Sequence, residues 1–177
     1  MAQEIFDVVD EEDRIIGEAR RDQVHGNPSL IHRVVHVLVF NRDHELYLQK
    51  RSRTKDVQPG KWDTSVGGHV DKGETYGEAA VREMEEELGI KGEHLDFLYK
   101  YRHCNEFESE FVSTYSCLWD GAITLCPEEI ETGGFWNLYD IAAHFDTGIF
   151  TPNFLDEITR YQDHLNPVGV CGSMPGK

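Results

Sequence analysis

The chain has 177 residues, of which 39% are hydrophobic and 28% are charged, and its formal net charge is −16. Its composition is that of a globular chain. The acidic balance argues against a general nucleic-acid binder, which needs a basic surface.

We expect a single domain over residues 1–165 that begins with a hairpin extension, followed by a flexible tail over 166–177 that is rich in glycine and proline. No apolar run approaches the roughly 18 residues of a membrane span. The first residues also lack the basic and then apolar pattern of a signal peptide, so a cytoplasmic location is expected. The cysteines, which form no C-x-x-C pair, are expected to be reduced thiols: Cys104, Cys117, Cys126 and Cys171.

Strand patterns dominate the first seventy residues. They predict a hairpin over Glu4–Arg20, a strand over His32–Phe40, a returning strand over Glu45–Lys50 and a short strand over Thr64–Val70 that contains Gly67 and Gly68. The polar stretch between the last two strands, Arg51–Trp62, is expected to be a loop.

The clearest helix is expected over Thr75–Leu88, with Gly89 at its end. At about 100° per residue, one apolar face is expected to hold Ala80, Val81, Met84 and Leu88. Further strands are expected over Leu95–Tyr101, Phe111–Trp119 and Gly134–Asn137, and further helices over Leu138–His144 and Asn153–Leu165. This mixed order predicts an α/β sandwich, a sheet between helices.

Three carboxylates on the first helix, Glu83, Glu86 and Glu87, stand at i, i+3 and i+4. They share one side, expected to lie away from the face of Ala80, Met84 and Leu88, whereas Glu85 falls elsewhere. Charge patterning alone favours a solvated acidic surface. A hard cation such as Mg²⁺ or Mn²⁺ would instead turn the repulsion between these groups into ligation.

The surrounding residues favour the metal-binding interpretation. Gly68 is followed after five residues by Glu74 and, after seven more, by the run Arg82–Ile90, which reads REMEEELGI. This pattern resembles the Nudix box, G-x5-E-x7-R-E-U-x-E-E-x-G-U with U an aliphatic residue, at every fixed position over 23 residues.

The resemblance implies a Nudix fold, with a mixed sheet between helices, and hydrolysis of a diphosphate linkage in a nucleoside diphosphate joined to another group. It implies that Mg²⁺ or Mn²⁺ is bound by Glu83, Glu86, Glu87 and the backbone carbonyl of Gly67. Glu83 is the preferred group to help deprotonate the attacking water. The resemblance also implies structural roles for Gly68, Glu74, Arg82 and Gly89.

Outside the box, residues Asp7–Ala143 resemble, more weakly, the type 1 isopentenyl-diphosphate isomerases and their hydrolase relatives. Those isomerases hold a metal through three histidines and two glutamates, and the matching positions here are His25, His32, His69, Glu108 and Glu110. Such a set suits Zn²⁺, Mn²⁺ or Fe²⁺. The alternative is that these are unconnected loop, core and surface residues.

Two departures favour hydrolysis over isomerisation. The isomerases carry a catalytic cysteine where this chain has Gly67, and they typically lose the carboxylates that match Glu83 and Glu86, which this chain keeps. Three functions stay open: a diphosphate hydrolase, an isomerase, and a non-catalytic module that binds nucleotide diphosphates.

A basic stretch precedes Gly67 in this acidic chain. Within it, Arg51, Lys55 and Lys61 are expected to contact substrate phosphates, the alternative being a solvated loop. The expected partner is a small-molecule diphosphate, with neither nucleic acid nor membrane, and a homodimer stays open.

Overall fold

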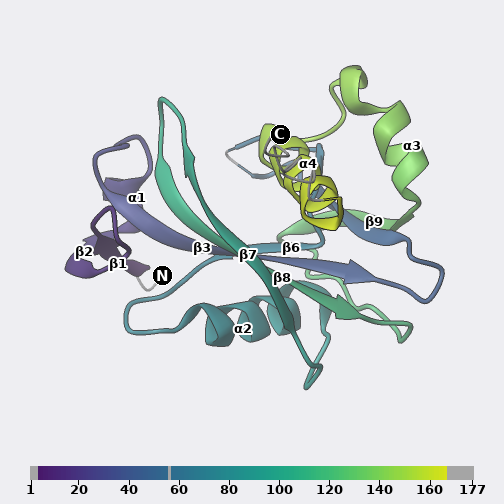
Figure 1. Cartoon of the computed structure of the whole chain (residues 1–177), viewed down its shortest axis with the longest axis horizontal. Helices are drawn as coiled ribbons and strands as arrows, with labels where there is room; N and C mark the ends of the chain where they lie inside the picture. Colours follow the sequence, from purple (N-terminus) through teal and green to yellow (C-terminus); the bar gives the residue numbers. More distant parts are fainter. Residues whose placement is uncertain (1–3, 56, 167–177) are drawn as a thin grey trace, which may run out of the picture.

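One nine-stranded sheet forms the centre of the molecule (Figure 1). The computed structural model describes residues 4–55 and 57–166, so the predicted tail lies outside the described residues from position 167 onward. The strands are β1 (Ile5–Val9), β2 (Ile15–Arg20), β3 (Ile31–Phe40), β4 (Leu46–Arg51), β5 (Trp62–Asp63), β6 (Val66–His69), β7 (Asp96–Cys104), β8 (Ser109–Leu118) and β9 (Ile130–Trp136).

Strand β3 organises this sheet. It runs parallel to β8 along its whole length and antiparallel to β6, and it also pairs with β1 and β4. β7 extends the sheet beyond β8, whereas β5 and β9 pair with β4. Because both faces of β3 are covered, eight of its ten residues are buried, as expected of a central strand with a nearly continuous apolar run.

The helices lie on both faces of the sheet, as Figure 1 shows. The helix α2 (Tyr76–Leu88) packs Ala80, Met84 and Leu88 against Val35 and Val37 of β3. The opposite face is covered by α3 (Leu138–Ala143), the 3₁₀ turn η1 (Phe145–Thr147) and α4 (Pro152–Leu165). The predicted α/β sandwich is therefore confirmed. None of the helices in the described part of the chain is long and apolar enough to cross a membrane.

Local signals fix both ends of α2. Thr75 accepts a hydrogen bond from the Glu78 amide and the Glu78 side chain bonds back to Thr75, which is a capping box. Gly89 ends the helix with a φ of 68°, a left-handed conformation that glycine adopts without strain. Because these signals are local, the predicted helix differs from α2 only at Thr75, which is the N-cap rather than the first helical residue.

Three expectations were wrong or incomplete. The sequence patterns missed α1 (Arg21–Val24) and β5, which are too short to show a period. Val81, which was expected on the apolar face of α2, is 42% exposed, and Ala79 is fully buried instead. The core side of α2 is therefore rotated away from Val81, toward the edge of the sheet where β6 lies.

Candidate functional site

The open edge of β6 is the place where the box residues meet. β6 pairs with β3 on one side, with Gly67 opposite His36 and Gly68 opposite Val35. The amide of Gly67 points away from β3 and donates to Oε2 of Glu87, at 3.3 Å. Since the N–H and C=O of one strand residue point to the same side, the Gly67 carbonyl also faces this open edge.

Glu87 is buried at this edge, with 7% of its surface exposed. Besides the Gly67 amide, it accepts a hydrogen bond from Nε2 of Gln49, at 3.0 Å. Burial, and next the charge of Glu83, raises the pKa of Glu87 to about 8. A divalent cation beside this carboxylate would favour the ionised form that burial disfavours.

Glu83 lies against the backbone of Gly68. A Cβ at position 68 would overlap the carboxyl carbon of Glu83, so only glycine allows this approach. Burial raises the pKa of Glu83 to about 7, against the opposing effect of Arg82.

Arg82 stabilises the loop that precedes α2. Its guanidinium donates two hydrogen bonds to Glu74, at 2.9 and 3.0 Å, one to the backbone carbonyl of His69, at 2.9 Å, and one to Glu83, at 2.8 Å. These bonds more than offset burial and lower the pKa of Glu74. The structure thus contains the Arg82–Glu74 pair that the sequence predicts.

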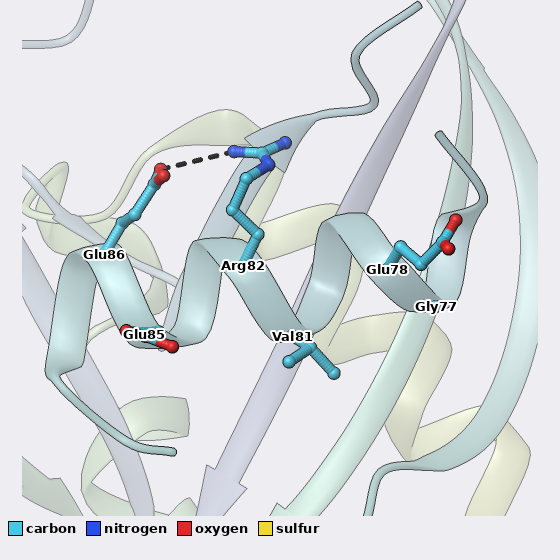
Figure 2. A pocket seen from close by; sticks show the side chains of 6 residues that line it. All are labelled: Gly77, Glu78, Val81, Arg82, Glu85 and Glu86. Carbon is cyan, nitrogen blue, oxygen red and sulfur yellow. Dashed lines mark hydrogen bonds and ion pairs between the residues drawn. The ribbon is translucent and has the colours of Figure 1, made fainter. Parts of the chain in front are cut away.

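Glu86 is the exposed member of the carboxylate set. Figure 2 shows it beside Arg82 on the outer side of α2, where the two side chains are 3.2 Å apart. Its side chain is 59% exposed. Glu85 points elsewhere and pairs with Lys91, as expected for a residue outside the set.

The expectation that all three carboxylates lie away from the apolar face was wrong. Glu87 is only about 20° from Ala80 around a helix with 100° per residue. It therefore enters the buried side of α2, and Glu83 lies beside it with only 15% of its side chain exposed. Their burial is what shifts their pKa values, which a solvated acidic surface would not do.

The five residues of the second predicted cluster converge on the sheet face opposite α2. The ring centroids of His25, His32 and His69 lie 5.1 to 5.8 Å apart. Ligand atoms of His32, His69 and Glu110 all lie within 4.8 Å of one another. Glu108 joins through His25, whose Nδ1 is 3.2 Å from the Glu108 carboxylate.

Several imidazole nitrogens of this histidine cluster have no hydrogen-bond partner within the described residues. They are Nε2 of His25 and both ring nitrogens of His32, although Nε2 of His32 lies 3.3 Å from Glu110. His32 is fully buried and Glu110 is 6% exposed. Burial, and next His32, holds the pKa of His69 well below its usual value, so this ring is neutral. Imidazole nitrogens without partners, together with carboxylates, fit a divalent metal ion.

The basic stretch is largely paired with acidic side chains. Arg51 pairs with Asp63 at 3.2 Å and Lys55 pairs with Glu129. Lys61 has no ion pair with another described residue. Burial lowers the pKa of Lys55, and Glu87 and Glu83 are close enough to act on it. Lys55 therefore lies within electrostatic range of the box carboxylates.

Sequence reasoning missed two polar residues of these sites and one buried cluster. Gln49 supports Glu87, and Arg21 of α1 acts electrostatically on both His69 and Lys55. The buried cluster joins α4 to the sheet through a pair between His36 and Glu157, whose Nδ1 and Oε2 are 2.6 Å apart. No local motif marks these residues, because their partners are far away in the sequence.

The pair is charged. Glu157 is fully buried, and although burial opposes it, the contact with His36 lowers the pKa of Glu157. The same contact raises the pKa of His36 against its own burial.

Comparison with known proteins agrees with this geometry. Residues 30–157 match the model of the NUDIX domain. The chain is 36% identical to an uncharacterised Nudix hydrolase of Yersinia pestis, covering 92% of this chain and 88% of the relative. It is 34% identical to the uncharacterised Nudix hydrolase YfcD of Escherichia coli K12, covering 89% and 86%. It is 31% identical to isopentenyl-diphosphate Delta-isomerase 1 of Photorhabdus laumondii, covering 89% and 97%.

Solved structures show the same fold. DR0079 from Deinococcus radiodurans superposes with a TM-score of 0.78 at 28% identity, covering 89% of this chain and 98% of that one. A MutT protein from Methanosarcina mazei shares the fold, with a TM-score of 0.66 at 22% identity, over 79% and 96% of the two chains. The chain belongs to the Nudix hydrolase family and is a hydrolase that acts on pyrophosphate bonds.

Proposed function

We propose that this chain is a metal-dependent hydrolase that cleaves the diphosphate linkage of a nucleoside diphosphate derivative or a related compound. The observation that carries the proposal is the meeting of the Glu87 carboxylate with the Gly67 backbone at the open edge of β6. Glu83 lies directly beside them, against Gly68.

In this proposal Glu83, Glu86, Glu87 and the Gly67 carbonyl hold Mg²⁺ or Mn²⁺. A divalent ion there lowers the pKa of an attacking water and neutralises phosphate oxygens. Glu83 would accept the proton of that water. Arg82 fixes the position of Glu83 and Gln49 fixes that of Glu87.

The histidine cluster is proposed to hold a second divalent ion, Zn²⁺, Mn²⁺ or Fe²⁺. The donor set supports this assignment because three nitrogens of His25 and His32 lack partners and Glu110 is within reach of both His32 and His69.

Phosphate contacts are proposed for Lys55 and Arg51, as predicted. A third contact is proposed for Arg21, which acts electrostatically on both Lys55 and His69. A phosphate contact is also proposed for Lys61. A phosphate would compete with Asp63 for Arg51 and with Glu129 for Lys55, so the acidic partners would keep these cations in place until substrate binds. The ligand is a small diphosphate rather than a nucleic acid or a membrane. The cytoplasmic location and a homodimer remain predictions.

An isomerase is the second candidate function, favoured by the convergence of the histidine cluster. Gly67 opposes it, because this position offers no thiol for proton transfer. Solvent deuterium should therefore not enter isopentenyl diphosphate in the presence of this protein, and its incorporation would favour the isomerase.

A substrate panel tests the hydrolase directly. Nucleoside diphosphates and triphosphates, nucleotide sugars and dinucleotides are incubated with Mg²⁺, with Mn²⁺ and with a chelator, and released phosphate and mononucleotide are measured. Glu86→Gln should abolish release without unfolding the chain, because Glu86 is exposed, and Glu85→Gln on the same helix is the matched control. Full activity in Glu86→Gln would contradict the mechanism. Binding without release in the wild type would favour the non-catalytic module.

A further inference from the structure

One glycine and three polar side chains line up across four neighbouring strands, beginning at the edge where a metal is proposed to bind. Gly67 of β6 is opposite His36 of β3, His36 is opposite Thr114 of β8, and Thr114 is opposite Tyr99 of β7. Glu157 of α4 lies over this row, so the row leads from the box edge to a buried carboxylate.

Glu157 is held by four donors. Its carboxylate contacts Nδ1 of His36 at 2.6 Å, and it accepts hydrogen bonds from Tyr99 at 2.6 Å, Tyr101 at 2.8 Å and Thr114 at 3.2 Å. Glu157 is fully buried. Packing of α4 against the sheet would require only an apolar residue at position 157. The polar set instead fixes the plane of the His36 ring, because the Glu157 carboxylate accepts the hydrogen bond that Nδ1–H donates.

The other edge of the His36 ring faces the backbone of Gly67. A Cβ built on Gly67 would lie 3.4 Å from Cδ2 and 3.7 Å from Nε2 of His36, which are ordinary contact distances. Gly67 lacks that atom, so this space is free. Thr64 borders the same space with its methyl group at 3.5 Å, and its buried hydroxyl has no partner among the residues described. The His36 side chain keeps 10% of its surface exposed.

We propose that His36, oriented by Glu157, forms a hydrogen-bonding subsite over Gly67 that selects diphosphates whose organic group carries oxygen, such as nucleosides or sugars, over hydrocarbon diphosphates. This inference rests on the proposed function, because it places the diphosphate at the β6 edge next to Gly67. The organic group then extends across Gly67 toward His36.

The selection follows from desolvation. An oxygen of the organic group can pair with Nε2 of His36, which replaces the water lost on binding. A hydrocarbon group would cover the same nitrogen, and the charged pair behind it, without offering a partner. Sites that provide a hydrogen bond discriminate strongly against analogues that cannot use it.

Binding without turnover tests this subsite. The affinities of the full chain for α,β-methylene-ADP and for a butyl methylenediphosphonate are measured by calorimetry in Mg²⁺. The wild type should prefer the nucleotide analogue. In His36→Gln, which keeps a donor for Glu157 but loses the second ring nitrogen, this preference should fall about 10- to 100-fold, through weaker nucleotide binding. His94→Gln, at an exposed histidine, is the matched control and should keep it.

Gly67→Ala provides a second variant that leaves His36 and Glu157 in place. Its methyl group would cover the ring edge at ordinary contact distances, and it should reduce the same ratio. Any effect of the substitution on binding of the diphosphate-like group, which both analogues share, cancels in the ratio of their two affinities. Glu157→Gln, which removes the charge that orients the ring, should lower the ratio less.

The outcomes separate the two proposals. Unchanged selectivity in both His36→Gln and Gly67→Ala, or a wild type that prefers the alkyl compound or binds neither, would overturn the subsite. Selective binding of the nucleotide analogue that His36→Gln reduces, together with no hydrolysis of any nucleotide, would support the subsite and contradict the proposed hydrolase.

Discussion

The two ends of the short strand β6 differ in how far the protein itself satisfies their polar groups. At Gly67 and Gly68, the carboxylates Glu83 and Glu87 receive hydrogen bonds from Arg82, Gln49 and the backbone. At His69, the neighbouring rings of His25 and His32 leave three nitrogens without partners in the described structure. The carboxylate edge is therefore preorganised by protein donors, whereas the histidine cluster leaves nitrogens open to a ligand.

The chemistry of the two sites differs in the same way. The edge offers oxygen ligands, which hard Mg²⁺ and Mn²⁺ prefer, whereas the cluster offers imidazoles, which suit Zn²⁺, Mn²⁺ or Fe²⁺. A relative at 31% identity carries the name isopentenyl-diphosphate Delta-isomerase 1. One short strand thus contributes residues to two clusters with different ligand chemistry, and the following changes separate them.

Glu87→Gln is expected to have the largest effect on the carboxylate edge. Loss of this ligand should reduce kcat by on the order of a hundredfold or more. A carboxylate whose pKa is raised above its unfolded value of 4.5 adds stability at low pH and loses it as the pH rises through about 8. The metal-free variant should therefore unfold, at pH 8.5, at no lower temperature than the wild type. Calorimetry with turnover assays checks both, and a strongly lowered Tm would contradict the burial argument.

His32→Phe should empty the histidine cluster while keeping the ring stacked near Phe6, whose centroid is 5.9 Å away. The expected loss in Zn²⁺ affinity exceeds the roughly 10- to 100-fold that removal of a ligand's supporting contact costs. Metal content after dialysis against Zn²⁺ measures this effect. An unchanged zinc content would contradict the metal site proposed at the histidine cluster.

Gln49→Met keeps the size of the side chain but removes the donor to Glu87. The affinity for Mg²⁺ should fall about 10- to 100-fold, because the ligand loses its supporting hydrogen bond. The Zn²⁺ content of the histidine cluster should not change. Equal losses at both sites would show that Gln49 supports the fold rather than the edge.

The pH dependence of Mg²⁺ binding tests the burial of the two carboxylates without any substitution. Glu83 and Glu87 have raised pKa values of about 7 and about 8, so both bind protons below neutral pH. Metal binding must displace those protons, and affinity should rise by about tenfold per pH unit for each proton displaced. The rise should level off above about pH 8. Isothermal titration between pH 6 and 9 measures it, and a flat profile would contradict the buried carboxylates.

The carboxylate edge could be predicted from sequence because its residues lie within 23 positions. The spacing of Gly68, Glu74 and the run from Arg82 defines a loop and a helix, and helix geometry places Glu83, Glu86 and Glu87 together. Their burial could not be predicted, because the rotation of α2 about its axis is set by packing against β3 and β6. The wrong placement of Val81 has the same cause.

The histidine cluster came from a resemblance rather than from local geometry. Its residues lie before β3, on β3, on β6, just before β8 and on β8, and only the parallel pairing of β3 with β8 brings His32 opposite Glu110. Gln49, Arg21 and the pair of His36 with Glu157 were missed for the same reason. His36 and Glu157 are 121 positions apart, and no local pattern announces such a contact.

The most direct test of the account is to measure Mn²⁺ stoichiometry and nucleoside diphosphate hydrolysis together in the wild type, Glu87→Gln and His32→Phe. The account predicts two ions for the wild type and one for each variant, with hydrolysis lost in Glu87→Gln and retained with Mg²⁺ in His32→Phe. Hydrolysis that survives in Glu87→Gln and disappears in His32→Phe would contradict it.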